Sequence, residues 1–222
     1  MVMNPKHAFW QALIFTIVVF LFGMLLGFVL ERGRAQEIEI NLANSELNLL
    51  DEQLRNQIIE NLNLSCDLAI ESTFGFADKI YGEALKLEKY DSASKFTNDL
   101  KIIHRRYDLL RTLLWVESIK LKDRCGDGFH TVVYFYEYET QDVGVRSQQI
   151  FFSRLLGDIK GGNPEEILLI PIAANLDLES VNIALENYDL TELPVVLIDE
   201  ERIIDDIITL EDARNIVFDA NN

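Results

Sequence analysis

Three patterns of hydrophobic and polar residues follow one another along the chain. Residues 8–30 are almost entirely apolar. Between about residues 35 and 124 proline is absent and apolar residues recur every three or four positions, which predicts helices. From Thr131 onward, short β-branched and aromatic runs alternate with helical patterns, which predicts strands and helices in turn. The expected fold class is therefore α/β: an N-terminal apolar helix, a helical middle region and a C-terminal domain with a mixed sheet.

The first apolar run is long enough to cross a membrane as one helix. At about 1.5 Å per residue, residues 8–30 cover the ~30 Å hydrocarbon layer of a bilayer. The charged residues Glu31, Arg32 and Arg34 follow directly. A cleaved signal peptide would have a shorter apolar core, of roughly 7–15 residues, and a small-residue cleavage site. We therefore expect an uncleaved anchor within residues 1–34 that binds the lipid bilayer of a cell membrane through residues 8–30.

Two features bear on dimerisation and orientation. Gly23 and Gly27 form a Gly-x-x-x-Gly pair, which lets two membrane helices approach closely, so a homodimer is one possibility. The basic residues on the two flanks of the apolar run are nearly balanced. An even number of cysteines is compatible with a disulfide in an exported domain, and residues 63–65 (Asn-Leu-Ser) form a glycosylation-type sequon. These two features favour an extracytoplasmic body.

Residues 35–127 are expected to form two to three helices. One is indicated by Leu47, Leu50, Leu54 and Ile58, and a shorter one lies between residues 76 and 90. The clearest helical stripe is made of Phe96, Leu100, Ile103, Tyr107, Leu110 and Leu114. Such a region fits either a helical hairpin packed on itself or on the C-terminal domain, or a coiled-coil dimer. The heptad pattern does not continue through several repeats, which favours the hairpin.

The two cysteines, Cys66 and Cys125, are too far apart in sequence for a Cys-x-x-Cys pair or a zinc-binding pattern. Cys66 is expected near the end of the first long helix and Cys125 at the end of the last. If these helix ends meet, a structural disulfide would form. Two buried, unpaired thiols are the alternative.

Residues 128–222 are expected to form the C-terminal domain, with the order β-α-β-α-β-β-α. The predicted elements are strands at 131–136, 167–173, 194–198 and 202–205 and helices at 146–160, 178–187 and 209–218. This domain is strongly acidic, with 19 Asp and Glu against 5 Lys and Arg from Gly128 to the end. It would repel phosphate backbones, so we expect protein partners and no nucleic acid. No metal-ligand or phosphate-binding pattern is present in the sequence, so no metal or cofactor is expected.

The order of these elements, together with the segment from Tyr188 to Ile198, resembles the thioredoxin-like superfamily over about residues 131–218. In that family a proline that follows a cis peptide bond opens the third strand beside the active site. The resemblance therefore implies a cis Leu193–Pro194 bond and a peptide-binding edge at Leu193, Pro194 and Val195. A trans proline at the start of a strand is the alternative, and it requires no function.

The chain departs from the redox-active members of that family at one place. They carry Cys-x-x-Cys between the first strand and its helix, and both thiols are required for disulfide exchange. Here the corresponding loop consists of Glu139, Thr140, Gln141, Asp142 and Val143. The resemblance therefore implies a redox-inactive member of the superfamily.

The expected function is that of a membrane-anchored, non-catalytic polypeptide-binding, scaffolding or chaperone-like module. Its contact surface would be the edge at Pro194 and the loop at residues 139–143. Two alternatives stay open at this point: a thiol–disulfide oxidoreductase or isomerase that uses Cys66 and Cys125, and a spacer subunit of a larger membrane complex. The sequence contains no recognisable catalytic constellation, and whether the chain is an enzyme is left open.

Overall fold

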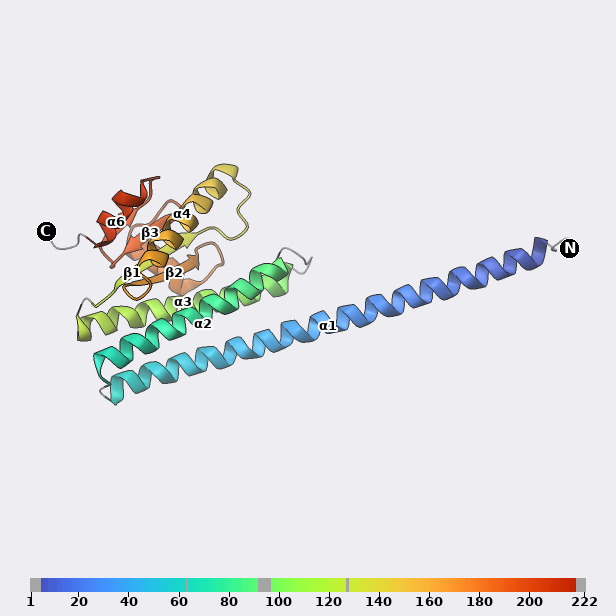
Figure 1. Ribbon diagram of the computed structural model, residues 1–222, viewed down its shortest axis with the longest axis horizontal. Coiled ribbons are helices and arrows are strands. Elements are labelled where there is room, and N and C mark those ends of the chain that lie inside the picture. Colours follow the sequence, from blue (N-terminus) through green and yellow to red (C-terminus); the bar gives the residue numbers. More distant parts are fainter. Residues whose placement is uncertain (1–4, 63, 92–96, 127, 219–222) are drawn as a thin grey trace. The chain divides into compact units, whose positions relative to one another are not determined.

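The computed structural model describes residues 5–62, 64–91, 97–126 and 128–218. The chain divides into two compact units, Met1–Leu47 and Asn48–Asn222. Helix α1 (Pro5–Asn61), blue in Figure 1, contributes residues to both units. We describe each unit by itself.

The first unit contains one strongly apolar segment of α1. Phe9–Leu30 has 22 residues and a mean hydropathy of 2.9, and it is long and apolar enough to cross a membrane. Its large apolar side chains are exposed, for example Phe15 and Leu30. At the end of the segment, the guanidinium carbon of Arg32 lies 4.4 Å from the centre of the Phe28 ring.

The second unit is built on a four-stranded mixed sheet. Its strands are β1 (His130–Tyr136), β2 (Ile167–Ala173), β3 (Val195–Ile198) and β4 (Arg202–Ile204), and they lie in the order β2-β1-β3-β4. β1 pairs in parallel with β2, whereas β1 with β3 and β3 with β4 are antiparallel. The order of strands and helices from residue 130 onward is the one that the sequence predicts.

Helices cover both faces of this sheet. Helices α4 (Val143–Gly162) and α6 (Leu210–Phe218) form one core with the β1 residues Val132 and Tyr134. The alternate residues of β1 point to the other face, because successive strand residues do so. There Phe135 contacts Trp115 of α3 (Thr97–Cys125), with 5.8 Å between ring centres. Helix α5 (Glu179–Asn187) contacts α3. Figure 1 shows α3 and α4 on opposite sides of the sheet.

Helix α2 (Cys66–Asp91) packs along α3, and the two run side by side in Figure 1. It is longer than the predicted helix at 76–90. The predicted stripe on α3 is buried where the structure describes it, at Ile103, Tyr107, Leu110 and Leu114. Phe96 and the side chain of Leu100 lie outside the described part of the chain.

The part of α1 in the second unit has its polar side buried and its apolar side exposed. Asn48, Glu52 and Asn56 are buried, and Glu52 has an exposed fraction of 0%. On the opposite side, Leu54 is 57% exposed, and Leu50 is exposed to the same degree. The leucine pattern therefore predicted the helix correctly, and the structure leaves these apolar side chains exposed.

The residues of α2 that meet α1 explain this reversal. Arg55 of α1 pairs with Glu52 and donates a 3.1 Å hydrogen bond to Thr73 Oγ1 of α2. Asn48 Nδ2 donates a 2.9 Å hydrogen bond to the Glu83 carboxylate of α2. Buried polar groups require partners, so α1 turns its hydrogen-bonding side toward the polar side chains of α2.

The turn between β3 and β4 connects the sheet to α3 through Asp199. Its carboxylate accepts hydrogen bonds from Lys122 Nζ at 2.6 Å and from the Thr131 backbone N–H at 2.9 Å. His130 Nδ1 lies 2.7 Å from it, and Arg202 pairs with it as well. Burial alone would raise the pKa of Asp199, but the hydrogen bonds from His130, Lys122 and Thr131 outweigh burial and hold that pKa well below its usual range.

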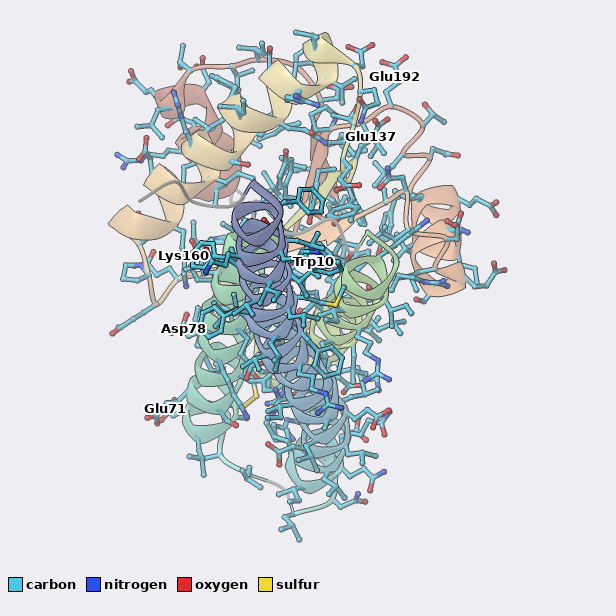
Figure 2. The ribbon with its side chains drawn as sticks, turned by 90° about the vertical axis from the view of Figure 1, so that its right-hand side faces the viewer. Trp10, Glu71, Asp78, Glu137, Lys160 and Glu192 are labelled. Atoms are coloured by element: carbon cyan, nitrogen blue, oxygen red, sulfur yellow. A yellow bond between two sulfur atoms is a disulfide. The ribbon has the colours of Figure 1, made fainter. Side chains whose placement is uncertain are left out.

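The C-terminal end of α4 is held by Lys160. Its ammonium group donates hydrogen bonds to the carbonyls of Pro164 (2.6 Å) and Ile167 (2.8 Å), at the start of β2. It also lies 4.9 Å from the centre of the Phe74 ring of α2. Figure 2 shows Lys160 on the side of the unit where Asp78 projects from α2. Lys160 therefore joins α4, β2 and α2.

Candidate functional site

The Leu193–Pro194 peptide bond is cis and lies directly before β3. In the antiparallel register Phe135 is opposite Val195, so Pro194 lies at the end of the sheet where β1 leaves for the next loop. Pro194 and Val195 are buried, and only Leu193 of this trio is partly exposed. β3 is also an interior strand, paired on both sides. At this position, therefore, Leu193 is the residue that a ligand can reach.

The loop at residues 139–143 is ordered by its own hydrogen bonds. Asp142 caps α4, because its Oδ1 accepts from the backbone N–H groups of Gly144 (2.7 Å) and Val145 (3.2 Å). Thr140 is buried, and its hydroxyl accepts a 3.3 Å hydrogen bond from the Asp142 N–H. A Cβ at Gly144 would lie 3.1 Å from the Asp142 carboxylate, so the cap requires a small residue there. The Asp142 carboxylate thus occupies the position next to the first turn of α4.

Four of the five residues of this loop are exposed, namely Glu139, Gln141, Asp142 and Val143. Glu139 has a left-handed backbone conformation, with a φ of 52°, and Val143 is 75% exposed. The backbone just before the loop is held by Asn175, whose side chain accepts from the Tyr138 N–H and donates to the Tyr138 carbonyl at 2.7 and 2.9 Å. The loop therefore projects from a rigid base.

Cys66 and Cys125 form a disulfide. It joins the start of α2 to the end of α3, as expected if two helix ends meet. Cys125 precedes β1, whereas the loop at residues 139–143 follows β1. The seven residues of β1 separate the two ends by about 20 Å at ~3.3 Å per residue. The disulfide is thus at the opposite end of β1 from the loop at residues 139–143.

Gly23 and Gly27 lie on α1 in the first unit. A Cβ built at either glycine would meet no atom within 4 Å. Both positions are therefore open on the helix surface.

A cavity of about 570 Å³ lies beside the loop end of β1. Such a volume is within the range of small-molecule and peptide side-chain sites, roughly 300–1,000 Å³. Its walls come from α2, α3, β1, β2 and α4. We call it the tyrosine cavity, because it is lined by Tyr81, Tyr107, Tyr134, Tyr136 and Tyr138. Sequence reasoning did not identify it.

The inner part of the tyrosine cavity is aromatic and apolar. Tyr134 and Tyr136 of β1 stack with 5.6 Å between ring centres, and Pro171 of β2 lies in the same lining. Tyr138 contacts His104 of α3, with 4.3 Å between ring centres. Tyrosines at every second position of a strand point to the same face. That alternation is the sequence signal that could have indicated a lined surface here.

Tyr107 adds a buried hydroxyl to the lining. It donates a 3.2 Å hydrogen bond to the Glu83 carboxylate of α2. Burial raises the pKa of Tyr107, and the neighbouring Glu83 raises it further. The hydroxyl therefore stays protonated at neutral pH.

Arg111 of α3 is a buried cation in the same lining. Its Nη1 donates to Asp108 Oδ1 at 3.0 Å, and this is its only hydrogen bond among the described residues. A guanidinium carries five N–H donors, so most of those of Arg111 have no acceptor among the described residues. Asp108 itself is 1% exposed, and burial raises its pKa although Arg111 acts in the opposite direction.

The entrance of the cavity is formed by exposed residues of two helices. Arg146, Ile150 and Arg154 follow one another at intervals of four along α4, so they lie on one side of that helix. Tyr81 and Leu85 are the exposed lining residues of α2. The entrance therefore combines apolar side chains with cationic ones.

The charged side chains around the entrance form few hydrogen bonds and ion pairs with the described residues. Arg146 Nη2 donates a 2.6 Å hydrogen bond to the Thr140 carbonyl, but it pairs with no carboxylate among the residues that the structure describes. Within the same described ranges, Arg154 has no hydrogen bond or ion pair. Glu137 and Glu139 line the cavity at its loop end and also form no ion pair with a described residue.

Among the described residues, no group of three or more His, Cys, Asp or Glu side chains is arranged to hold a metal ion. Comparison of the chain with protein-family models, with curated proteins and with solved structures gives no match.

Proposed function

We propose that this protein is a membrane-anchored, thioredoxin-like module that binds segments of polypeptide and acts without thiol chemistry. The tyrosine cavity is the observation that carries this proposal. It is open to solvent beside the loop end of β1, and it offers aromatic, apolar and charged groups together. Leu193 and the loop at residues 139–143 lie at the same end of the sheet and extend the contact surface.

The thioredoxin-like part of the proposal is supported by topology. The element order β-α-β-α-β-β-α and the mixed sheet, with strands in the order β2-β1-β3-β4, support it. Helices α4 and α6 cover one face of this sheet. A cis bond precedes the proline that opens β3, as the resemblance implies.

The membrane anchor is supported by length and composition. The 22 residues of Phe9–Leu30 extend about 33 Å as a helix, enough for the ~30 Å apolar layer of a bilayer. Their side chains are exposed, and an exposed apolar surface of this size is unfavourable in water. Insertion into lipid would bury that surface. An extracytoplasmic body is our proposal for the orientation, supported by the Cys66–Cys125 disulfide, since such bonds persist in oxidising compartments.

Polypeptide binding is supported by the chemistry of the lining. Tyrosine rings present large, rigid surfaces and a polar hydroxyl, and they are enriched where proteins bind other proteins. Tyr134 and Tyr136 are held by the sheet, and Tyr138 is held through Asn175, so the aromatic surface is fixed before a ligand arrives. A preformed site loses less entropy on binding than a mobile one.

A peptide-binding measurement on the full chain in lipid nanodiscs tests this function. Fluorescence polarisation of short, labelled peptides rich in Tyr and Leu should show saturable binding. Ala84→Trp places a bulky ring in the cavity from α2 and should abolish it. Ile183→Trp makes the same change on the exposed surface of α5, away from the cavity lining, and should have no effect. Equal binding by both variants, or no binding by the native chain, would refute the proposal.

A further inference from the structure

Arg111 has more hydrogen-bonding capacity than the protein uses. Its side chain is 10% exposed, and it lines the tyrosine cavity. The Asp108 carboxylate accepts one of its N–H groups. The remaining donors have no acceptor among the described residues, and none of its nitrogens is sealed off from solvent without a partner. A buried donor without an acceptor is costly, so these N–H groups require water or a ligand in the cavity.

The shape of the guanidinium indicates which ligand group fits. Its planar fork of N–H donors matches the two oxygens of a carboxylate, and charged hydrogen bonds of this kind are roughly twice as strong as neutral ones. Asp108 already holds one side of the fork, through Nη1. The other donors have no acceptor among the described residues, and Arg111 belongs to the lining of the cavity.

Two further arginines lie at the entrance. Arg154 has no hydrogen-bond or ion-pair partner among the described residues, and Arg146 is bound only to a backbone carbonyl there. These cations are unusual in a domain with 19 acidic and 5 basic residues from Gly128 onward. Two of those five basic residues thus line one cavity, which attracts anions against the general charge of the domain.

The groups that face these arginines restrict where an anion can bind. Glu137 and Glu139 line the loop end of the cavity and repel a carboxylate there. His104 and the hydroxyl of Tyr107 face the cavity from α3, and Tyr107 is already directed at Glu83. An anion is therefore favoured near the arginines of the lining, Arg111 and Arg154, and disfavoured beside the loop.

We infer that the tyrosine cavity selects acidic segments of polypeptide, in which a carboxylate binds Arg111, Arg154 at the entrance attracts the acidic segment, and a neighbouring aromatic or aliphatic side chain packs on Tyr134 and Tyr136. This inference rests on the proposed polypeptide binding and specifies its ligand. The carboxylate can belong to an Asp or Glu side chain or to the C-terminus of the bound segment, because both present the same two oxygens.

Four synthetic peptides test the selectivity. All four share one Tyr- and Leu-rich sequence. Three have an amidated C-terminus and a central Asp, Asn or Lys. The fourth has a central Asn and a free C-terminus. The full chain in nanodiscs should bind the Asp peptide, or the peptide with the free C-terminus, at least ~10-fold more tightly than the amidated Asn peptide. The Lys peptide should bind most weakly. The tighter of the two acidic peptides identifies the source of the carboxylate.

Substitutions then assign the preference to the arginines. Arg154→Gln changes an exposed residue and should reduce the preference severalfold. The double substitution Asp108→Asn with Arg111→Met removes both buried charges together, so that neither is left unpaired, and it should abolish most of the preference. Arg214→Gln, an exposed arginine on α6 outside the cavity, is the matched control and should preserve it.

The outcomes separate this inference from the proposed function. Equal affinity for all four peptides, with loss of binding in Ala84→Trp, would overturn the acidic selectivity and leave polypeptide binding intact. Tightest binding of the Lys peptide would overturn the selectivity as well. Absence of binding to any peptide would refute the proposed function itself.

Discussion

Arg111 and Asp108 lie one helical turn apart on α3, with 3.0 Å between Nη1 of the arginine and Oδ1 of the aspartate. The carboxylate is almost fully buried, and its Oδ2 has no hydrogen-bond partner among the described residues. Such a pair costs desolvation energy that hydrophobic side chains would not require. A ligand-binding role for Arg111 accounts for such a pair beside an open cavity.

Removal of one member of this pair should be more harmful than removal of both. Arg111→Met alone should lower the free energy of unfolding by about 3–5 kcal/mol, because it leaves a buried carboxylate without its cation. The double substitution with Asp108→Asn should recover a large part of that loss. Urea unfolding of the full chain in detergent, followed by tryptophan fluorescence, measures both. A double variant as unstable as the single one would contradict this interpretation of the pair.

Asp199 should be a major determinant of stability. Asp199→Asn removes a carboxylate that Lys122, His130 and Arg202 share, and it should cost about 2–4 kcal/mol, because the site is only partly buried. Asp158→Asn, at an exposed position of α4, should change the free energy of unfolding by less than about 0.5 kcal/mol. Urea unfolding at neutral pH compares the two variants.

The contribution of Asp199 should also depend on pH. Because its pKa is lowered in the folded protein, the stabilisation is complete above its unfolded pKa of about 3.9 and is lost as the pH falls toward the folded value. The difference in stability between the native chain and Asp199→Asn should therefore be constant above about pH 5 and shrink in more acidic solution. A difference that grows as the pH falls would have the wrong sign for this account.

The Cys66–Cys125 disulfide should be structural. Cys66→Ala with Cys125→Ala opens a loop that spans 59 positions, and the free energy of unfolding should fall by about 2–4 kcal/mol. Peptide binding by the folded variant should be unchanged, because the disulfide lies at the other end of β1 from the cavity. If the native chain instead turned over a dithiol substrate, and this variant did not, the thiol–disulfide oxidoreductase alternative would replace our proposal.

The part of α1 within the second unit should be held to α2 by its polar side. Glu52→Ala leaves Arg55 without its buried partner and should cost about 2–4 kcal/mol. Leu54→Gln, on the exposed side of the same helix, should change stability by no more than about 0.5 kcal/mol. The two variants are measured by the same unfolding experiment. A larger loss from Leu54→Gln than from Glu52→Ala would show that the apolar side is buried in solution.

The strands and helices of the second unit could be predicted because their residues carry local signals. The run Thr131–Tyr136 is β-branched and aromatic, and it is a strand. Helix α4 begins at Val143, three residues before the predicted start, because the Asp142 cap lies within what the sequence presents as a loop. Which side of α1 is buried could not be predicted from its leucines alone. It depends on Thr73 and Glu83, which are supplied by another helix.

The candidate site shows the same division between local and long-range information. The proline at residue 194 and the absence of cysteines from residues 139–143 are visible in the sequence. The tyrosine cavity is not, because its lining is contributed by five elements between residues 81 and 171. Arg111 and Arg154 are separated by a strand and the two loops that flank it, and only the packing of α3 and α4 on β1 brings them into one lining.

Photo-crosslinking from inside the cavity tests the central claim most directly. A photoreactive phenylalanine at position 150, on the α4 side of the entrance, should crosslink to the acidic peptide, and mass spectrometry should locate the crosslink at that residue. Addition of excess unlabelled peptide should suppress it. The same group at position 183, exposed on α5 outside the cavity lining, should give no crosslink. Equal crosslinking from both positions, or none from position 150 under conditions of saturable binding, would contradict the account.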